Sequence, residues 1–221
     1  MHPHSLSILA AGLVLTAGPG AATLVDLGAC DGANACVITA TPPNPVSPDP
    51  NDGILLAWDE RQNITLTAPL RVDRVFDELA SFVTPIGDDF LIAAGTVVSS
   101  HYLQWDPGAG SSGTVETIVT LDSQIFAFVT DDQNLFDSDA ALGLPGLDYN
   151  DFRLRGLESG DLTTFQGASA AIDWSATSPG DWTRLITAFS PGGETPVVPL
   201  PAALPMLLAG LGGLAALRRR G

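Results

Sequence analysis

The chain has 221 residues, of which 25 are acidic and nine are basic, and its formal net charge at pH 7 is −16. All nine basic residues are arginine, and three of them form the run Arg218–Arg220 beside the C-terminus, so the rest of the chain is still more acidic. Such a surface repels phosphate backbones and disfavours nucleic acid as a partner, while the length between the two ends accommodates one domain with its own core.

Residues 1–22 have the pattern of a secretory signal peptide. Leu6–Ala17 is an apolar core of the usual length, and a Gly-Pro-Gly sequence follows it. Gly20 and Ala22 place small residues at the −3 and −1 positions, so we expect cleavage after Ala22. The stretch before the apolar core holds two histidines but no lysine or arginine, so its positive charge is weaker than usual.

Residues 23–52 form a predicted N-terminal segment with two cysteines and many prolines. Cys30 and Cys36 are separated by five residues, and an oxidising compartment outside the cytoplasm favours a disulfide between them. Closing so short a loop adds roughly 2–3 kcal/mol in the chain-entropy model. Two free thiols or a metal pair are the alternatives, although the single remaining histidine leaves too few ligands for zinc. Thr41–Asp52 carries five prolines and is expected to be a loop or extended linker.

Residues 53–189 show many short β-prone runs separated by polar, glycine and proline connections. Ile54–Trp58 is an apolar run, and Ile64–Ala68 alternates apolar with polar residues. Arg71–Val83 is ambiguous, because its apolar residues also fit helical spacing. The pattern predicts an all-β, antiparallel β-sandwich or jelly-roll-like domain rather than βαβ units. The other expected strands are Leu91–Val98, His101–Trp105, Thr114–Leu121, Ile125–Thr130, Leu162–Gln166, Ala170–Trp174 and Trp182–Ala188.

Residues 198–221 combine three signals in a fixed order. Val198–Ala202 reads VPLPA, Ala203–Leu217 is an uncharged apolar run, and Arg218–Arg220 follows it. An apolar run followed by arginines is typical of a membrane segment whose arginine end stays in the cytoplasm, so it predicts a single transmembrane helix. A helix over this run and the alanine before it would be about 24 Å long, shorter than the hydrocarbon core of about 30 Å. Residues 190–197 are the expected linker that leaves the motif accessible to a protease.

This tail resembles the VPLPA variant of the PEP-CTERM class of bacterial sorting signals. The resemblance implies that an exosortase, an integral-membrane cysteine protease similar to transpeptidases, recognises the motif and removes a tail that anchors the chain briefly in the inner membrane. An anchor that is never processed is the alternative. The resemblance makes Val198, Pro199, Leu200, Pro201 and Ala202 the recognition site, and Arg218, Arg219 and Arg220 the stop-transfer charges.

The central region also resembles uncharacterised domains that precede such tails. The stretches that carry this resemblance are GILLAWDERQNITLTAPLRVD, SSHYLQWDPG, DDQNLFDSDAALGLPGLDYNDFRLRGLE and SPGDWTRLITA. That group has no established activity, so the resemblance implies a β-rich extracellular module and no particular chemistry.

An aspartate-rich stretch is the strongest local candidate for a cofactor site. Carboxylate and amide oxygens are the ligands that calcium prefers, and several of them gather here within a few residues. The spacing is not that of an EF-hand, and turn formation by aspartate and asparagine is the alternative. We expect no other cofactor. The candidate calcium ligands are Asp131, Asp132, Asn134, Asp137 and Asp139.

The sequence offers little support for catalysis. His101 is the only histidine outside the signal peptide, and a serine triad would need it together with Ser99 or Ser100. No nucleophile-elbow pattern surrounds either serine, so we expect a satisfied strand histidine and no enzyme.

These patterns together predict an exported cell-surface or extracellular-matrix protein with a structural or adhesive role, associated with exopolysaccharide. Its expected partners are an exosortase-type membrane protease, the inner membrane and the polysaccharide. A carbohydrate-binding module that uses its tryptophans, or a secreted hydrolase, is the alternative. The aromatic residues are also consistent with a simple core.

Overall fold

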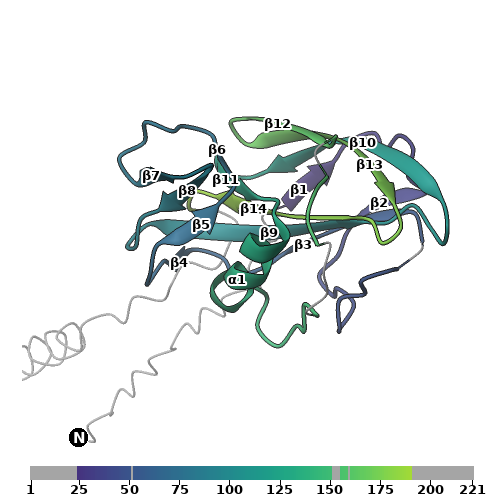
Figure 1. Cartoon of the computed structure of the whole chain (residues 1–221), viewed down its shortest axis with the longest axis horizontal. Coiled ribbons are helices and arrows are strands. Elements are labelled where there is room, and N and C mark those ends of the chain that lie inside the picture. Colours follow the sequence, from purple (N-terminus) through teal and green to yellow (C-terminus); the bar gives the residue numbers. More distant parts are fainter. Residues whose placement is uncertain (1–23, 51, 151–154, 159, 191–221) are drawn as a thin grey trace, which may run out of the picture.

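A computed structural model describes residues 24–50, 52–150, 155–158 and 160–190 of the chain (Figure 1). The predicted signal peptide 1–22, the tail 198–221 and nearly all of the linker 190–197 lie outside the described residues. Within the described ranges, no helix is both long and apolar enough to cross a membrane. The two terminal signals therefore stay predictions.

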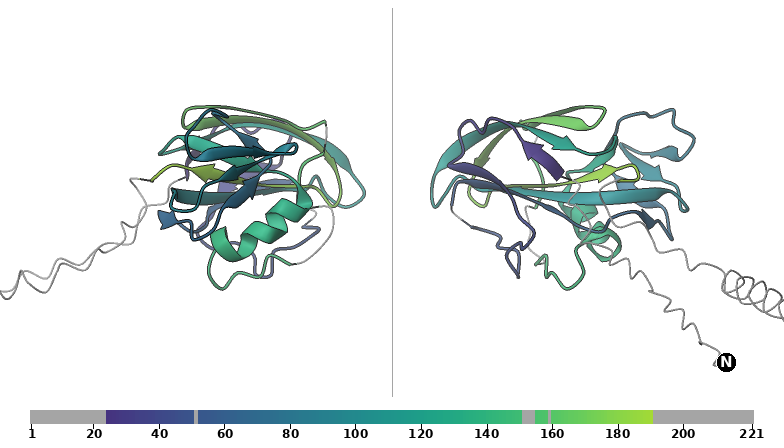
Figure 2. Two further views of the ribbon diagram at one scale, coloured as in Figure 1. Left: turned by 60° about the vertical axis from the view of Figure 1, so that its left-hand side comes forward. Right: turned by 180° about the vertical axis from the view of Figure 1, so that it is seen from behind.

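The central sheet runs through the whole domain. Its strand order is β2 (Ala35–Ile38), β3 (Ile54–Asp59), β9 (Val97–Trp105), β14 (Asp181–Thr187), β11 (Ile125–Val129) and β6 (Arg74–Val75), and β4 (Ile64–Thr65) pairs with the start of β9. These neighbours pair antiparallel except for β2 and β3, which are parallel. Every residue of β14 is buried, because other layers cover both faces of the sheet (Figure 2).

The outer sheet covers one face of the central sheet. Its strands follow the order β1 (Leu24–Leu27), β10 (Ser112–Leu121), β13 (Ser169–Thr177) and β12 (Leu162–Gln166). β13 alternates buried and exposed residues, so Ile172 and Trp174 face inward while Asp173 faces solvent. The inward side chains pack against Leu103 and Leu185 of the central sheet and form the first core.

The opposite face of the central sheet is covered by a helix and a small sheet. The small sheet has the order β5 (Leu70–Val72), β8 (Asp89–Ile92) and β7 (Val83–Ile86), and the helix is α1 (Asp132–Leu142). Tyr102 and Trp182 of the central sheet pack with Leu135 and Leu142 of α1 in the second core. The molecule therefore has three layers, with the central sheet in the middle (Figure 2).

The predicted β-sandwich is confirmed in outline, since the described residues are mostly strand with one helix. The predicted N-terminal segment 23–52 packs as part of this sandwich, because it supplies β1 to the outer sheet and β2 to the central sheet. The predicted strand Leu91–Val98 is wrong in one respect, since a turn at Gly95 divides it between β8 and β9. Arg71–Val83 forms short strands and turns rather than a helix, although its apolar residues also fit helical spacing.

Helix α1 is the element that the sequence reading missed. Asp131 caps its first turn, and Asp132 places a negative charge at the positive end of the helix dipole. The helix ends before Gly143, where an added Cβ would lie 2.6 Å from the Asp139 carbonyl oxygen and 2.7 Å from the Tyr149 ring. Glycine therefore lets the following loop turn back tightly against the helix.

Candidate functional site

Two clefts flank helix α1. The larger, with a volume of about 680 Å³, lies between the helix and the chain from Arg61 to Arg71. The smaller, of about 380 Å³, lies against Phe136 and the loop 143–150. Arg61 and Ala140 line both clefts, and we call the two clefts together the α1 track.

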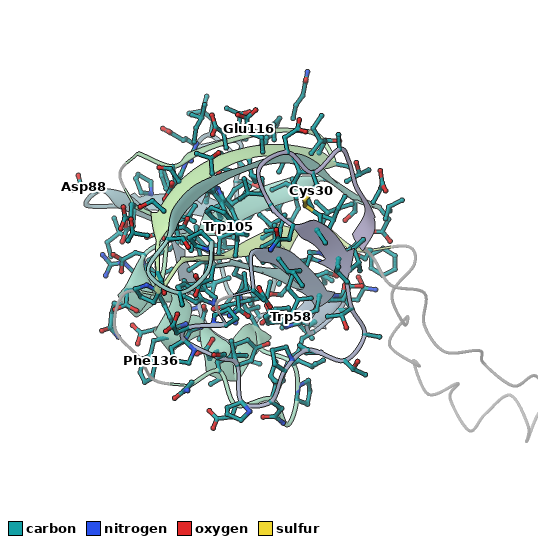
Figure 3. The ribbon with its side chains drawn as sticks, turned by 90° about the vertical axis from the view of Figure 1, so that its right-hand side faces the viewer. Cys30, Trp58, Asp88, Trp105, Glu116 and Phe136 are labelled. Carbon is teal, nitrogen blue, oxygen red and sulfur yellow. A yellow bond between two sulfur atoms is a disulfide. The ribbon has the colours of Figure 1, made fainter. Side chains whose placement is uncertain are left out.

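The α1 track places hydrogen-bonding groups beside an exposed aromatic ring. Arg61 donates from Nε to the carbonyl oxygen of Gly143 at 3.2 Å, which holds its guanidinium at the junction of the clefts. Thr65 and Thr67 add exposed hydroxyl groups along the larger cleft. Phe136 is 46% exposed and lies at the periphery of the molecule (Figure 3). This combination of groups suits a hydroxyl-rich ligand such as a polysaccharide.

Beneath the track, a buried network of charged side chains ties α1 to the central sheet. Arg184 of β14 donates to Glu60 twice, from Nε to Oε2 at 2.6 Å and from Nη2 to Oε1 at 2.8 Å. Its Nη2 also donates to Asp139 Oδ1 on α1 at 2.9 Å. The hydroxyls of Ser100 and Tyr149 donate to the Glu60 carboxylate as well. The buried carboxylate is thus paired and hydrogen-bonded on both oxygens, as burial of a charge requires.

Arg155 is the second guanidinium of this network. It binds Asp139 through two hydrogen bonds, from Nη1 to Oδ2 at 2.7 Å and from Nη2 to Oδ1 at 3.0 Å. Its Nε and Nη2 donate to the Tyr102 hydroxyl at 3.2 and 3.0 Å. The backbone amide of Arg155 donates to Asp132 Oδ1 at 3.1 Å. These bonds fix the start of the segment 155–158 against α1.

The surroundings of the network shift the pKa values of Tyr102, Tyr149 and Arg184. Burial raises the pKa of Tyr102 to about 12. Burial, and after it the nearby Glu60 carboxylate, also raise the pKa of Tyr149. Burial opposes the charge of Arg184, but Glu60 and Asp139 outweigh that cost and raise the pKa of the guanidinium. These tyrosines and this arginine keep their charge state near neutral pH, so the network serves to hold α1 in place.

The five candidate calcium ligands lie at the start of α1 and along it. Asp131 is the N-cap residue, and its carboxylate accepts a backbone N–H of the first turn at 2.9 Å. Asp132 accepts the Arg155 amide described above. Asn134 donates from Nδ2 to Asp73 Oδ1 at 2.6 Å. Each of these three groups is engaged by a different neighbour.

The other two candidates have hydrogen-bond partners of their own. Asp137 is exposed and accepts the Gln133 side-chain amide at 2.8 Å, whereas Asp139 faces the two buried arginines. Among the described residues, no three Asp, Glu, His or Cys side chains converge on a position for an ion. The structure does not bring the five together, and calcium binding by them stays a prediction.

His101 lies between a carboxylate and a hydroxyl. Its Nδ1 is 2.7 Å from Asp59 Oδ1, and its Nε2 is 3.1 Å from Thr187 Oγ1. This order of groups occurs in nucleophile relays, but Thr187 is fully buried and no substrate reaches it. Ser99 and Ser100 hydrogen-bond other side chains. The serine-triad form of the hydrolase alternative therefore has no geometric basis here.

The four tryptophans belong to the two cores. Trp58, Trp105, Trp174 and Trp182 are each at most 1% exposed, and Figure 3 shows the first two inside the molecule. Their faces are not accessible to a sugar. On the α1 track, Phe136 supplies the exposed aromatic ring for such a contact.

The remaining predicted site residues are the disulfide and the sorting motif. Cys30 and Cys36 form a disulfide with their Cα atoms 5.8 Å apart; Cys36 lies in β2, and both cysteines pack against the first core. Val198–Ala202 and Arg218–Arg220 lie outside the described residues.

No protein-family model, curated protein or solved structure matches this chain. The candidate site therefore rests on geometry. Sequence reasoning missed both Arg61 and Phe136. For Phe136, the available signal was an aromatic residue inside the largely polar stretch DQNLFDSD.

Proposed function

We propose that this chain is an exported protein of the cell surface or extracellular matrix with a structural or adhesive role, held against exopolysaccharide through the α1 track. A signal peptide before the sandwich and a single membrane helix after it complete the proposed organisation. An exosortase-type protease recognises the VPLPA motif and removes that helix. We propose no catalytic activity.

The α1 track is the observation that supports the proposed contact with polysaccharide. Arg61 and Ala140 line both of its clefts, so a long chain that passes this junction can contact both of them. Arg61 stands at their junction, and Phe136 presents an exposed ring. The buried pairs of Arg184 and Arg155 hold the helix that carries this surface. A rigid, solvent-facing surface suits binding without catalysis.

The composition and the two ends support export. The acidic surface favours solubility outside the cell, and the disulfide Cys30–Cys36 suits an oxidising compartment. The order of motif, apolar run and arginines in the tail suits transient anchoring.

Retention on exopolysaccharide tests the proposed contact. We expect the purified protein to be retarded in a gel that contains polysaccharide from the producing organism. Replacing Phe136 with alanine should weaken the affinity about 3–10-fold, because an aromatic contact contributes about 0.5–1.5 kcal/mol. Ile118→Ala on the outer sheet is the matched control, since Ile118 is 53% exposed and far from the track in the layer order. Equal retardation of Phe136→Ala and the unmodified protein would contradict the assignment.

The intact mass of the protein recovered from its producer tests the proposed sorting. Removal of residues 1–22 and of the chain beyond the VPLPA motif should both be visible in one spectrum. A chain that still carries Arg218–Arg220 and remains in the cytosol would refute the export proposal.

A further inference from the structure

A second group of carboxylates gathers at the end of the sandwich where β9 ends and β12 and β14 begin. Asp181 is the first residue of β14 and lies opposite Trp105, the last residue of β9. The largest charge interactions of its carboxyl group are all with acidic side chains, namely Asp161, Glu158 and Asp106. We call these carboxylates the end cluster.

Asp181 is buried without a conventional hydrogen-bond donor. The residue is 0% exposed, and no donor among the described residues bonds to either of its carboxylate oxygens. The Asp161 carboxylate is the neighbouring charge that raises the pKa of Asp181 most. Two ionised carboxylates offer only acceptors to each other. A positively charged species is therefore required between them, because an uncompensated buried charge is among the most unfavourable arrangements in a protein.

The surrounding chain holds the end cluster in place. Asp161 accepts the backbone amides of Ser175 at 2.8 Å and Glu158 at 2.6 Å, one on each oxygen. Each of those oxygens keeps a lone pair for a further ligand. Gly180 has φ of +86°, and a Cβ there would lie 2.8 Å from the Asp106 Cα. Glycine therefore permits the close approach that brings Asp181 against the end of β9.

We propose that the end cluster binds a calcium ion between Asp181 and Asp161. Calcium takes about six to eight oxygen ligands, and carboxylates with main-chain and water oxygens are its usual set. No three acidic side chains of the described chain converge on one point, so in this proposal two carboxylates bind the ion directly, and main-chain and water oxygens complete its shell. Asp106 and Glu158 add negative charge around it.

A proton shared by Asp181 and Asp161 is the alternative to the calcium ion. Burial, followed by the neighbouring Asp161 and Glu158, raises the pKa of Asp181 to about 8. If a proton took the place of the ion, calcium would not change the stability of the protein. Adding calcium therefore distinguishes the two cases.

Thermal unfolding of the full chain in EGTA and in calcium chloride tests the proposal. We expect a rise in Tm of roughly 5–10 °C at a calcium concentration about 100 times Kd. Asp181→Asn, which keeps the shape and removes the charge, should abolish this rise. Asp173→Asn on the exposed face of β13 is the matched control and should respond as the unmodified chain does. An unchanged Tm in calcium, or a full rise in Asp181→Asn, would overturn the proposal.

Terbium luminescence gives a second readout that needs no variant. Trp105 pairs with Asp181 and Trp182 follows it in β14, so terbium in the end cluster should be excited through tryptophan. Calcium chloride should then quench the luminescence by displacement. Absence of sensitised luminescence, or luminescence that calcium leaves unchanged, would overturn the site even if Asp181→Asn failed to fold.

Discussion

The two acidic regions of this molecule differ in how their charges are compensated. The stretch Asp131–Asp139 is conspicuous in the sequence, yet Asp131 caps α1, Asp139 faces Arg155 and Arg184, and the exposed Asp137 accepts a hydrogen bond from Gln133. The end cluster is scattered along the sequence, and the charged groups that raise the pKa of its fully buried Asp181 are, among the described residues, acidic. The density of aspartate along a chain is therefore a poor guide to how its carboxylates are compensated in the folded protein.

The largest expected effect comes from the compensated region. Arg184→Met leaves Glu60 buried without its main partner, so we expect the free energy of unfolding to fall by about 3–5 kcal/mol. Arg71→Met is the control, because its pair with Asp89 is half exposed on the arginine side and contributes no more than about 1 kcal/mol. Urea unfolding of both variants measures the difference. Similar losses in the two would show that the buried network is not what holds α1.

In the absence of calcium, a substitution in the end cluster is expected to make the protein more stable. In EGTA, Asp181→Asn should raise the free energy of unfolding by about 1–3 kcal/mol, because an amide can donate to Asp161 and carries no charge. Asp173→Asn should stay within about 0.5 kcal/mol of the unmodified protein, as exposed substitutions do. Chemical denaturation near pH 8.5 reports both. A loss of stability in Asp181→Asn would mean that its carboxylate is compensated after all.

The smallest effect separates the two regions by their response to calcium. Asp131→Ala removes the N-cap of α1 and should cost about 1 kcal/mol, while Asp137→Ala removes an exposed contact with Gln133 worth a few tenths. Neither change should alter the rise in Tm that calcium produces. Loss of that rise in either variant would place the ion on α1, as the sequence pattern alone suggested.

The strands were accessible from the sequence where one face of a sheet meets water. β10 and β13 alternate buried and exposed residues, and the predicted strands at Thr114–Leu121 and Ala170–Trp174 fall within them. Helix α1 was not accessible, because only a few apolar residues such as Leu135 and Leu142 mark its buried face in an otherwise polar stretch. A pattern of aspartates therefore indicated turns.

The buried network was beyond a single sequence for a different reason. Glu60 and Arg184 are 124 residues apart, and the sequence around either residue does not indicate that the two form a pair. The same holds for Asp106 and Asp181, which lie near each other because β9 and β14 pair from Trp105 and Asp181 onward. Pairings of this kind follow from sheet topology, which local periodicity does not specify.

A crystal structure of the protein grown with calcium tests the difference between the two acidic regions most directly. We expect one ion between Asp181 and Asp161, with oxygen ligands at about 2.3–2.6 Å, and none along α1. An ion bound to Asp131–Asp139 instead, or an end cluster without any ion in saturating calcium, would contradict the account.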